Sequence, residues 1–441
     1  MSLKVVKFGG SSLADANQMK KAANIIKADA GRKYIVVSAP GKRFSGDIKV
    51  TDLLYSLYDN RNSEKFDSVF SAVKSRFYSI IDDLGIKVNL EREFNEIEKN
   101  IKISTTPDYA ASRGEYLNAI IFSVYTEFEF VDAAETVFFD NFGKFDSKKT
   151  YNVLRNILPE KQGCVIPGFF GSNPDNTVKT FSRGGSDITG SIIARAVNAD
   201  VYENWTDVSG MLMADPAIVD NPKVIPSVTY RELRELSYMG AVVLHEDAVF
   251  PVSEAGIPIN IKNTNFPEHK GTIISAEPLE NIKSGNITGI AGKVGFSSIL
   301  VEKDMMNNEI GIGRKVLQIL EEYGISFEHL TSGIDSMGVI VSTESIKDIK
   351  DEILDKIIRT VDADSVSVED GIALIAVVGR GMIKEKGTAA KVFTAAANAG
   401  VNIKLIDQGS FELSIIIGVD EKDYVKIINA LYKQFDSEFC K

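Results

Sequence analysis

Close to the start of the chain lies the stretch Val5-Val6-Lys7-Phe8-Gly9-Gly10-Ser11-Ser12, an apolar run that stops at two glycines and two serines. Such a run predicts a buried strand that ends in a tight turn. Because glycine lacks a Cβ atom, the N–H groups of Gly9 and Gly10 can approach an anion closely, and the serines add hydroxyl donors before a helix. Lys7 adds a flexible positive charge. The stretch predicts a phosphate-binding turn; the alternative is a surface lysine before an ordinary glycine turn.

The segments that follow complete a βαβ unit. Apolar residues recur at helical spacing over Asp15–Ala30, and the β-branched run Tyr34–Val37 leads into Ser38-Ala39-Pro40-Gly41. Such units build parallel sheets that bind ligands beyond the carboxyl ends of their strands. We therefore expect an α/β domain in which a mostly parallel sheet carries helices on both faces. The polar stretch Gly41–Thr51 suits a mobile lid, with Thr51 capping the next helix.

A later predicted helix, Asp108–Glu127, contains a glycine in its middle. Gly114 costs about 1 kcal/mol relative to alanine there, which is tolerated where another element packs closely. Glu115 is therefore a candidate to face a ligand amine, and a solvated helix glutamate is the alternative. The helical segment Glu64–Ile103 is expected to cover the site, and the run Cys164–Gly171 to form a pocket wall.

A second glycine-rich loop, Phe181-Ser182-Arg183-Gly184-Gly185-Ser186-Asp187, precedes a predicted helix at about 188–198. Arg183 offers a bidentate fork for a carboxylate or a phosphate. Asp187 is either an ordinary helix N-cap or a carboxylate that holds Mg²⁺ among anionic ligands. Together the two loops indicate a phosphoryl-transfer site. They match neither the P-loop nor the dinucleotide fingerprint.

Two acidic turns follow the predicted strand Asp200–Glu203. They are Trp205-Thr206-Asp207-Val208-Ser209-Gly210 and Ala214-Asp215-Pro216. Carboxylates beside an aromatic ring suit the base, ribose and metal of a nucleotide. The alternative is a turn-rich loop without a ligand.

Composition excludes several classes of function. With 441 residues, the chain should hold two to four domains at about 150 residues each. Its net charge of −11 and the lack of a Lys/Arg cluster argue against nucleic-acid binding. Two cysteines and three scattered histidines support neither disulfides nor structural zinc, and they indicate a reducing cytoplasmic compartment. No apolar run long enough to span a membrane and no signal peptide is present.

Two C-terminal segments, 299–330 and 375–406, repeat each other without a gap. Five positions match: Glu309 with Glu385, Gly311 with Gly387, Lys315 with Lys391, Val316 with Val392 and Gly324 with Gly400. Each copy reads as strand, glycine loop, helix and strand, which predicts a small α+β unit. Their exposed strand edges should pair with each other or with another subunit.

The glycine loops and acidic turns occur in the order Lys7 to Ser12, Gly114-Glu115, Arg183 to Asp187, Thr206-Asp207-Val208 with Gly210, Asp215-Pro216 and Leu244-His245. In this order they resemble the motifs of aspartokinases, members of the amino acid kinase family, over nearly the whole chain. The resemblance implies the amino acid kinase fold over residues 1–275. It also implies transfer of the ATP γ-phosphoryl group to the side-chain carboxylate of L-aspartate. The product would be 4-phospho-L-aspartate, the first intermediate toward lysine, threonine and methionine.

The resemblance also implies roles for individual residues. The expected catalytic residues are Lys7, Arg183 and Asp187, with Asp187 also a possible ligand of Mg²⁺. ATP is expected to contact Lys7, Gly9, Gly10, Ser11, Thr206, Asp207 and Asp215. L-Aspartate is expected to contact Thr51, Glu115, Arg183 and Ser186, with Glu115 on its amino group and Arg183 on its α-carboxylate. Because a carboxylate is already a nucleophile, the reaction requires positioning and charge neutralisation and no general base.

Three positions depart from the pattern common in that family. Val242 stands where many relatives carry lysine, Leu212 where tyrosine is common, and Ala217 where arginine often follows Asp-Pro. All three lie in the predicted nucleotide half, so the adenine contacts stay open.

The repeat resembles tandem ferredoxin-like ACT domains, expected at 285–345 and 365–441, with strands shared from about 270–290. In this family such modules bind an amino acid effector, here lysine or threonine, and support a homodimer or a dimer of dimers. The candidate effector contacts are Met306, Gly311, Ile312, Ser326 and Glu328, with Glu328 facing a lysine ammonium group. The alternative is that the repeat only mediates dimerisation. No fused homoserine dehydrogenase domain is expected.

Two other readings stay open. The chain could be another amino acid kinase, such as glutamate 5-kinase or acetylglutamate kinase, although the ACT-like repeat argues against both. It could also be a catalytically silent amino acid sensor on the same scaffold. The presence of Lys7, Glu115, Arg183 and Asp187 together argues against a sensor.

Overall fold

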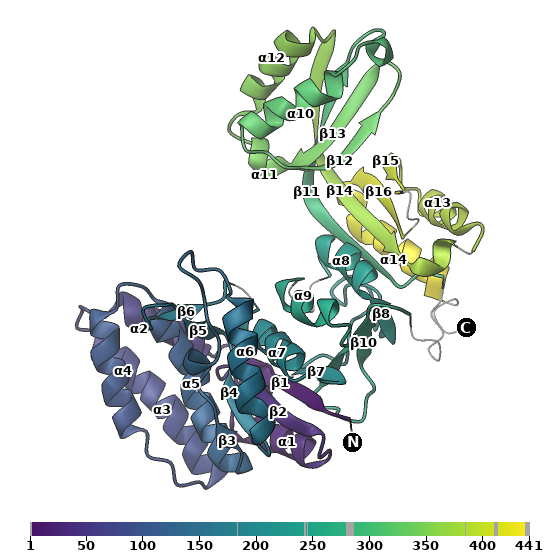
Figure 1. The fold of residues 1–441 in the computed structure, drawn as a ribbon. Coiled ribbons are helices and arrows are strands. Elements are labelled where there is room, and N and C mark those ends of the chain that lie inside the picture. The colour runs from purple at the N-terminus through teal and green to yellow at the C-terminus, as the bar shows by residue number, and fades with distance from the viewer. Residues whose placement is uncertain are drawn as a thin grey trace. The chain divides into compact units, whose positions relative to one another are not determined.

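The computed structural model describes residues 2–182, 184–241, 244, 246–278, 286–383, 385–409 and 413–436. The chain divides into two compact units. The first unit comprises Met1–Met211, Val224–Tyr230 and Val243–Ile282. The second comprises Leu212–Lys223, Arg231–Val242 and Lys283–Lys441 (Figure 1). No helix in the described part of the chain is both long enough and apolar enough to cross a bilayer.

The first unit is built on an eight-stranded sheet. Its strands are β1 (Lys4–Phe8), β2 (Arg32–Val37), β3 (Glu129–Phe130), β4 (Cys164–Pro167), β7 (Val201–Thr206), β8 (Ser227–Thr229), β9 (Ile259–Asn263) and β10 (Thr272–Ser275). They lie in the order β3-β4-β2-β1-β7-β9-β10-β8, and only β9 and β10 pair antiparallel. A separate antiparallel pair, β5 (Phe170–Ser172) and β6 (Val178–Thr180), follows β4. The predicted mostly parallel sheet is confirmed.

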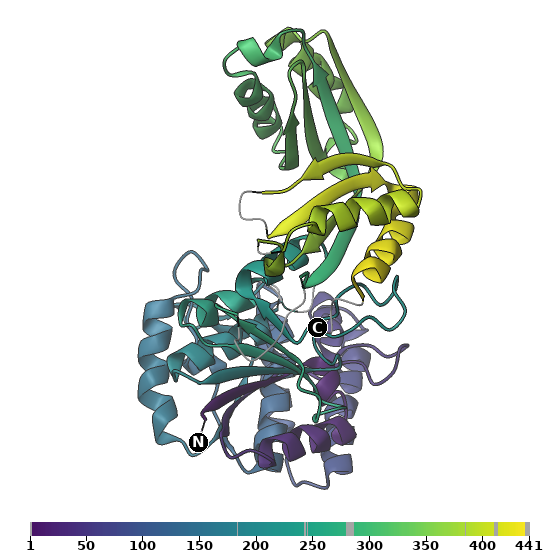
Figure 2. The same ribbon diagram turned by 90° about the vertical axis from the view of Figure 1, so that its right-hand side faces the viewer.

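Helices cover both faces of this sheet (Figures 1 and 2). One face carries α1 (Ala16–Lys27) and α5 (Asp108–Thr126), with α2 (Val50–Asp59), α3 (Phe66–Leu84) and α4 (Glu91–Ile103) packed outside them. The other face carries α6 (Ser147–Ile157), α7 (Gly185–Ala196) and α9 (Glu246–Glu254). Short 3₁₀ turns are η1 (Gly10–Leu13), η2 (Ala133–Glu135) and η3 (Leu158–Glu160). The helical stretch expected at 64–103 is thus two helices, α3 and α4.

Because β1 is pleated, its side chains alternate between the two faces of the sheet. Val6 and Phe8 belong to the core shared with α1 and α5, where the Phe8 ring meets Phe122 with centroids 6.2 Å apart. Successive side chains on a strand point to opposite faces. Lys7 therefore lies on the face covered by α7, one residue before the strand ends.

The second unit holds a six-stranded antiparallel sheet in the order β12-β13-β11-β14-β16-β15. Its strands are β11 (Gly289–Glu302), β12 (Phe327–Ser332), β13 (Ser336–Ser342), β14 (Ser365–Val378), β15 (Ile403–Asp407) and β16 (Ser414–Asp420). Its helices are α8 (Tyr230–Tyr238), α10 (Ile312–Glu322), α11 (Thr343–Ile346), α12 (Lys350–Val361), α13 (Thr388–Asn398) and α14 (Tyr424–Phe435), with 3₁₀ turns η4 (Met306–Asn308), η5 (Arg380–Ile383) and η6 (Glu421–Asp423). The two predicted α+β modules are confirmed.

The sequence repeat is visible as a structural repeat. Gly311 and Gly387 have φ values of 91° and 93° and directly precede α10 and α13, which explains why both copies carry glycine there. The modules also share strands, because residues 289–293 of β11 pair with residues 374–378 of β14. The second module thus takes a strand from the chain before the first.

Two segments inside the predicted kinase domain pack in the second unit. Met213 O accepts a hydrogen bond from Ile290 N at 2.7 Å. On α8, the carboxylate of Glu232 is fully buried, and it accepts from Arg380 Nη1 at 2.8 Å and from Arg380 N at 3.1 Å. Their sequence gives no sign of this, because helical periodicity does not identify the partner of a buried face.

Candidate active site

The carboxyl edge of the first unit's sheet brings Lys7 and Asp187 together. Lys7 Nζ lies 2.5 Å from Asp187 Oδ1, and only 7% of Lys7 is exposed. Lys7 comes from β1, and Asp187 comes from the first turn of α7. A lysine held here by one carboxylate can exchange that partner for an anionic ligand.

Residues of strand β7 donate hydrogen bonds to Asp187. Asn204 is the register partner of Lys7 on β7, so both side chains face α7. Asn204 Nδ2 donates to Asp187 Oδ1 at 2.9 Å, and the Tyr202 hydroxyl donates to the Asp187 carbonyl at 3.1 Å. Sequence reasoning missed Asn204 and Tyr202, because only strand register shows that they adjoin Asp187.

Asp187 can also serve a metal ion. Both side-chain contacts above use Oδ1, and Oδ2 meets no hydrogen-bond donor among the described residues. The described residues contain no group of three or more His, Cys, Asp or Glu side chains arranged to hold a metal. A magnesium ion here would therefore take most of its ligands from phosphate oxygens and water, as this ion commonly does.

The first glycine turn packs backbone against backbone. Gly41 N donates to Gly10 O at 2.8 Å, and a Cβ atom on Gly41 would lie 2.6 Å from Gly10 C. Gly9 N donates to Trp205 O at 2.9 Å, and Gly9 directly precedes η1. The second serine, Ser12, is buried and receives a hydrogen bond from Thr264 Oγ1 at 2.7 Å. The turn is thus fixed by β7 and by the Ser38–Gly41 turn after β2.

The second glycine loop is pressed against the turn after β4. A Cβ atom on Gly185 would lie 2.5 Å from Phe169 Cδ2, and one on Gly168 would lie 2.7 Å from Ser186 Cβ. Gly184 has φ 58° and caps α7, so Asp187 is not the N-cap. Phe169 has φ 79°, an uncommon value for an aromatic residue and one that recurs at ligand sites. Arg183 lies outside the described residues, so its predicted contact with the substrate carboxylate stays a prediction.

Glu115 is buried at the same edge of the sheet. Only 5% of it is exposed, and its Oε2 has no hydrogen-bond partner among the described residues. Burial raises the pKa of Glu115 to about 8, against the opposing effects of the Ala39 N–H and of Arg113 and Lys7. A buried carboxylate with an open oxygen suits a ligand that brings its own positive charge, such as an ammonium group.

Gly114 explains how α5 comes so close to the sheet. A Cβ atom there would lie 2.7 Å from Ala39 Cβ and 3.2 Å from Leu54 Cδ1, so the expected close approach is from the β2 turn and α2. Asn118, one turn after Glu115, donates from Nδ2 to Ser38 O at 2.6 Å. Sequence reasoning missed Asn118, although a polar residue on the apolar side of α5 was a signal.

Thr51 lies in the first turn of the next helix and does not cap it. The helix α2 starts at Val50, with Lys49 as its cap residue and no side-chain capping bond, so Thr51 is not the cap. The reason is that Val50 is fully buried and its N–H donates to Pro40 O at 3.2 Å, which extends the first turn. Thr51 is partly exposed at this end of α2.

The turn after β7 lies beside the first glycine turn. Thr206 Oγ1 donates to Asp207 Oδ1 at 3.1 Å, and it lies 4.0 Å from the position of a Cβ atom on Gly9. Trp205 is only 1% exposed and packs 6.3 Å from Phe8. The expectation that an aromatic ring here meets a nucleotide base is therefore wrong for Trp205, because its position in the pleat turns it into the core.

The remaining nucleotide candidates lie outside the first unit or outside the described residues. Asp215 is exposed in the second unit, where Asp215 Oδ1 accepts from Ala217 N at 2.8 Å. Its role beside the phosphate loops stays a prediction. Val242 and His245 lie outside the described residues.

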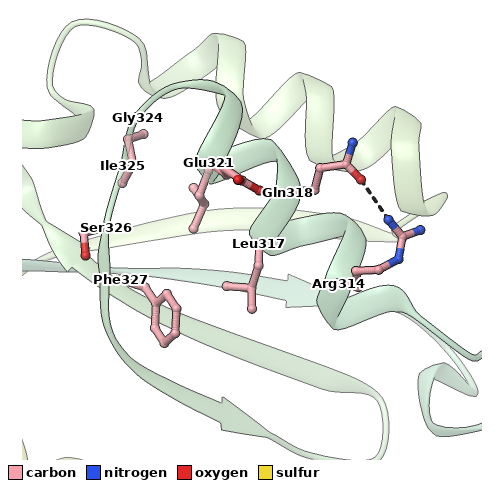
Figure 3. Close-up of a pocket in the computed structure, with 9 residues that line it drawn as sticks. Arg314, Leu317, Gln318, Glu321, Gly324, Ile325, Ser326 and Phe327 are labelled. Carbon is pink, nitrogen blue, oxygen red and sulfur yellow. Dashed lines mark hydrogen bonds between the residues drawn. The ribbon is translucent and has the colours of Figure 1, made fainter.

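The effector candidates in the second unit have different surroundings. Met306 and Ile312 are buried in the core of the first module, and Gly311 is the cap of α10. Ser326 lines an open groove of about 1000 Å³ between α10 and the start of β12, together with Arg314, Leu317, Gln318, Leu320, Glu321, Gly324, Ile325 and Phe327 (Figure 3). Glu328 accepts a hydrogen bond from the Tyr238 hydroxyl. Of the five candidates, only Ser326 lines this groove.

Comparison with known proteins gives two family matches. The model of the amino acid kinase family matches residues 2–263, and that of the ACT domain matches residues 375–435. Among curated proteins, the chain is 40% identical to aspartokinase 3 of Bacillus subtilis, and the alignment covers 98% of each chain.

Solved structures agree with these matches. The chain is 50% identical to the aspartate kinase of Clostridium acetobutylicum, with a TM-score of 0.89, and the match covers 99% of this chain and 100% of that one. It also matches Escherichia coli aspartokinase III, solved with aspartate and ADP, with a TM-score of 0.75 and 23% identity over 98% of this chain and 100% of that one. At that identity the second likeness shows the fold alone.

Proposed function

The chain belongs to the aspartokinases of the amino acid kinase family, and from this premise we propose that it transfers the γ-phosphoryl group of ATP to the side-chain carboxylate of L-aspartate. The product is 4-phospho-L-aspartate, and the pathway served is the synthesis of lysine, threonine and methionine. The observation that carries this proposal is the Lys7–Asp187 pair at the edge where the first glycine turn and the helix after the second glycine loop meet.

Lys7 and the first glycine turn supply what phosphoryl transfer needs. Negative charge spreads over the oxygens of the transferred group, and catalysis rests on positioning and electrostatic stabilisation. Lys7 Nζ sits beside Gly9, so it would meet the phosphoryl group together with the N–H groups of Gly10 and Ser11, whereas the Gly9 N–H is already bonded to Trp205 O. Ser11 and Thr206 flank the same turn and would contact the nucleotide with Asp207.

Glu115 supports L-aspartate as the acceptor. Its buried carboxylate would bind the substrate ammonium group, while Arg183 would take the α-carboxylate and Ser186 and Thr51 would complete the site. With the ammonium group and the α-carboxylate of L-aspartate both held, the side-chain carboxylate of the substrate is left to face Lys7. Such positioning supplies much of the rate enhancement of a two-substrate reaction.

Mg²⁺ would be held by Asp187 through Oδ2 and by the phosphates of ATP. When bound, the ion would supply positive charge to the phosphate oxygens of ATP. Lys7 and Asn204 orient the carboxylate through Oδ1, so this chain fixes the direction of Oδ2 before nucleotide binds. Asp187 thus fits the role of a magnesium ligand.

The second unit supports regulation by an amino acid. We propose lysine as the favoured effector, with threonine as the second candidate, bound at the first ACT module near Ser326 and Glu328. Strands β12 and β15 end the six-stranded sheet, and such edges suit pairing with a second copy of the chain. A homodimer, or a dimer of dimers, through these modules is therefore part of the proposal.

The aspartyl hydroxamate assay tests the function. The enzyme is incubated with ATP, Mg²⁺ and hydroxylamine, with and without L-aspartate, and hydroxamate is measured by its ferric complex. Product that depends on both ATP and aspartate supports the proposal. Product with glutamate or N-acetylglutamate would indicate one of the other amino acid kinases, and no product with any acceptor would indicate an amino acid sensor.

A further inference from the structure

Helix α3 carries a charged residue on its buried face. Its core positions are apolar, with Phe70, Val73, Phe77 and Ile80 all buried, and Arg76 occurs among them at the same helical spacing with only 6% of its surface exposed. A buried arginine is uncommon and is expected to have charged or hydrogen-bonding partners. None of the roles proposed above uses Arg76.

The guanidinium group of Arg76 reaches three separate segments. Its Nη1 donates to Asp47 Oδ2 at 2.6 Å, and its Nη2 donates to Gly41 O at 2.6 Å and to Ala14 O at 3.1 Å. Its Nε is buried and has no partner among the described residues. The side chain thus leaves one donor unsatisfied and aims its fork at two backbone carbonyls and a carboxylate.

These partners belong to the two turns that border the candidate active site. Ala14 follows η1, which continues the first glycine turn. Gly41 starts the polar stretch that leads to Thr51, and its N–H donates to Gly10 O. Arg76 therefore donates hydrogen bonds to both of the segments that pack against each other at Gly10 and Gly41.

Asp47 extends the same contact into the polar stretch. Its Oδ2 accepts from Arg43 N at 3.0 Å, and its two oxygens also accept from the Arg43 guanidinium at 2.8 and 2.9 Å. Phe44 and Ile48 in this stretch are 63% and 54% exposed, so its apolar side chains contribute little packing. The bonds to Asp47 and Gly41 are therefore the main attachment of the stretch to α3.

We propose that Arg76 is a positioning residue for phosphoryl transfer. Its planar fork holds the Gly9–Gly10 turn and the Gly41–Thr51 stretch against each other, so that the N–H groups that meet the phosphoryl group and the side chain of Thr51 keep their relative places. This inference rests on the proposed function. Lysine cannot replace the fork, because one ammonium group cannot reach two carbonyls and a carboxylate in these directions.

Arg76→Lys tests this with kinetics and thermal unfolding side by side. We expect kcat in the hydroxamate assay to fall about tenfold or more, since small misplacements of reacting groups have effects of this size. The matched control is Arg32→Lys. Arg32 is also a partly buried arginine, and it donates to the carboxylate of Glu203 and to the carbonyl of Ile25. Unlike Arg76, it lies at the amino end of β2, away from the candidate active site. Its variant should keep kcat while changing the Tm.

Each outcome decides the question. A fall in kcat for Arg76→Lys with a Tm no lower than that of Arg32→Lys supports the proposal. Unchanged kcat, or a fall in kcat together with a Tm below that of Arg32→Lys, overturns it. If Arg76→Lys does not fold, the uncharged Arg76→Gln takes its place with the same expectation, and failure of both to fold overturns a positioning role. An inactive wild type overturns the proposed function and this inference with it, whereas an active wild type with a fully active Arg76→Lys overturns this inference alone.

Discussion

Lys7 Nζ and Asp187 Oδ1 lie 2.5 Å apart, although Lys7 belongs to the first strand and Asp187 to the helix that follows the second glycine loop. The pair is possible because β1 and β7 are neighbours, and α7 runs back over them on the face that Lys7 occupies. Parallel βαβ topology therefore brings together two sequence motifs that are far apart in the chain.

Removing the Lys7 charge should mainly affect the chemical step. In Lys7→Met we expect kcat to fall about a thousandfold or more, because the charge acts on the developing negative charge of the transition state. L-Aspartate should still bind within a few-fold of its wild-type Kd, as measured by calorimetry. The control is Lys4→Met, at the other end of β1, where Lys4 pairs with Asp29 and Glu203; its kcat should not change. A large loss of aspartate binding in Lys7→Met would reassign Lys7 to substrate recognition.

Asp187→Asn should change the response to Mg²⁺. The amide keeps the shape of the side chain but loses the anionic oxygen that is open to a metal, so we expect a higher Mg²⁺ concentration for half-maximal activity and a kcat at least tenfold lower. Activity titrated against free Mg²⁺ at saturating ATP measures both. An unchanged Mg²⁺ requirement would show that another residue holds the ion.

The buried carboxyl group of Glu115 should make the free energy of unfolding of the ligand-free protein decrease as the pH rises. Its pKa is raised from an ordinary value of 4.5 to about 8 by burial. Between these values the folded state keeps a proton that the unfolded state has released, so the free energy of unfolding falls as the pH increases from 4.5 to 8. Glu115→Gln removes this effect and should unfold at a higher temperature than wild type at pH 8. Equal pH profiles for the two proteins would contradict a buried, uncompensated carboxylate.

Aspartate binding should show the opposite dependence on pH. The substrate ammonium group favours the ionised form of Glu115, so below pH 8 binding must also remove a proton. We expect the KM for aspartate to decrease as the pH rises from 6.5 to 8, and proton release to appear as a buffer-dependent binding enthalpy. Glu115→Gln should bind aspartate weakly, with no such dependence. A KM for wild type that is flat over this range would remove Glu115 from the amino-group site.

Millimolar lysine should inhibit the enzyme through the first ACT module. Glu328 is the candidate partner of the effector ammonium group, and its carboxylate now accepts a hydrogen bond from Tyr238 on α8. We expect Glu328→Ala to relieve inhibition, measured as the lysine concentration for half-maximal activity. Glu344→Ala, at an exposed carboxylate of the same module, is the control. Inhibition that is the same in Glu328→Ala and wild type would exclude Glu328 from the effector site.

Much of the first unit was predictable because its signals are local. The run before Gly9 and the β-branched run after α1 define two neighbouring strands, and the glycines mark the turns that border the site. Gly114 predicted a close approach, which the structure places at Ala39. The constant spacing of the C-terminal repeat likewise predicted two modules, with glycines at matching helix starts.

The features that could not be predicted from the sequence depend on contacts between residues that are far apart in the chain. The contacts of Asn204 with Asp187 follow from strand register, and the burial of Trp205 follows from the direction of the pleat. The packing of α8 in the second unit depends on Arg380, far along the chain. Arg76 did leave a signal, a charged residue at an apolar position of α3, but the partners it holds are visible only in three dimensions.

Borohydride trapping of the product tests the central claim most directly. Reduction of an acyl phosphate by borohydride gives an alcohol, so phosphorylation of the side-chain carboxylate of aspartate leads to homoserine, and phosphorylation of the α-carboxylate leads to 3-amino-4-hydroxybutanoate. The site around Lys7, Asp187 and Glu115 predicts homoserine from wild type with ATP, Mg²⁺ and L-aspartate, and almost none from Lys7→Met. Formation of 3-amino-4-hydroxybutanoate, or no trapped alcohol from wild type, would contradict it.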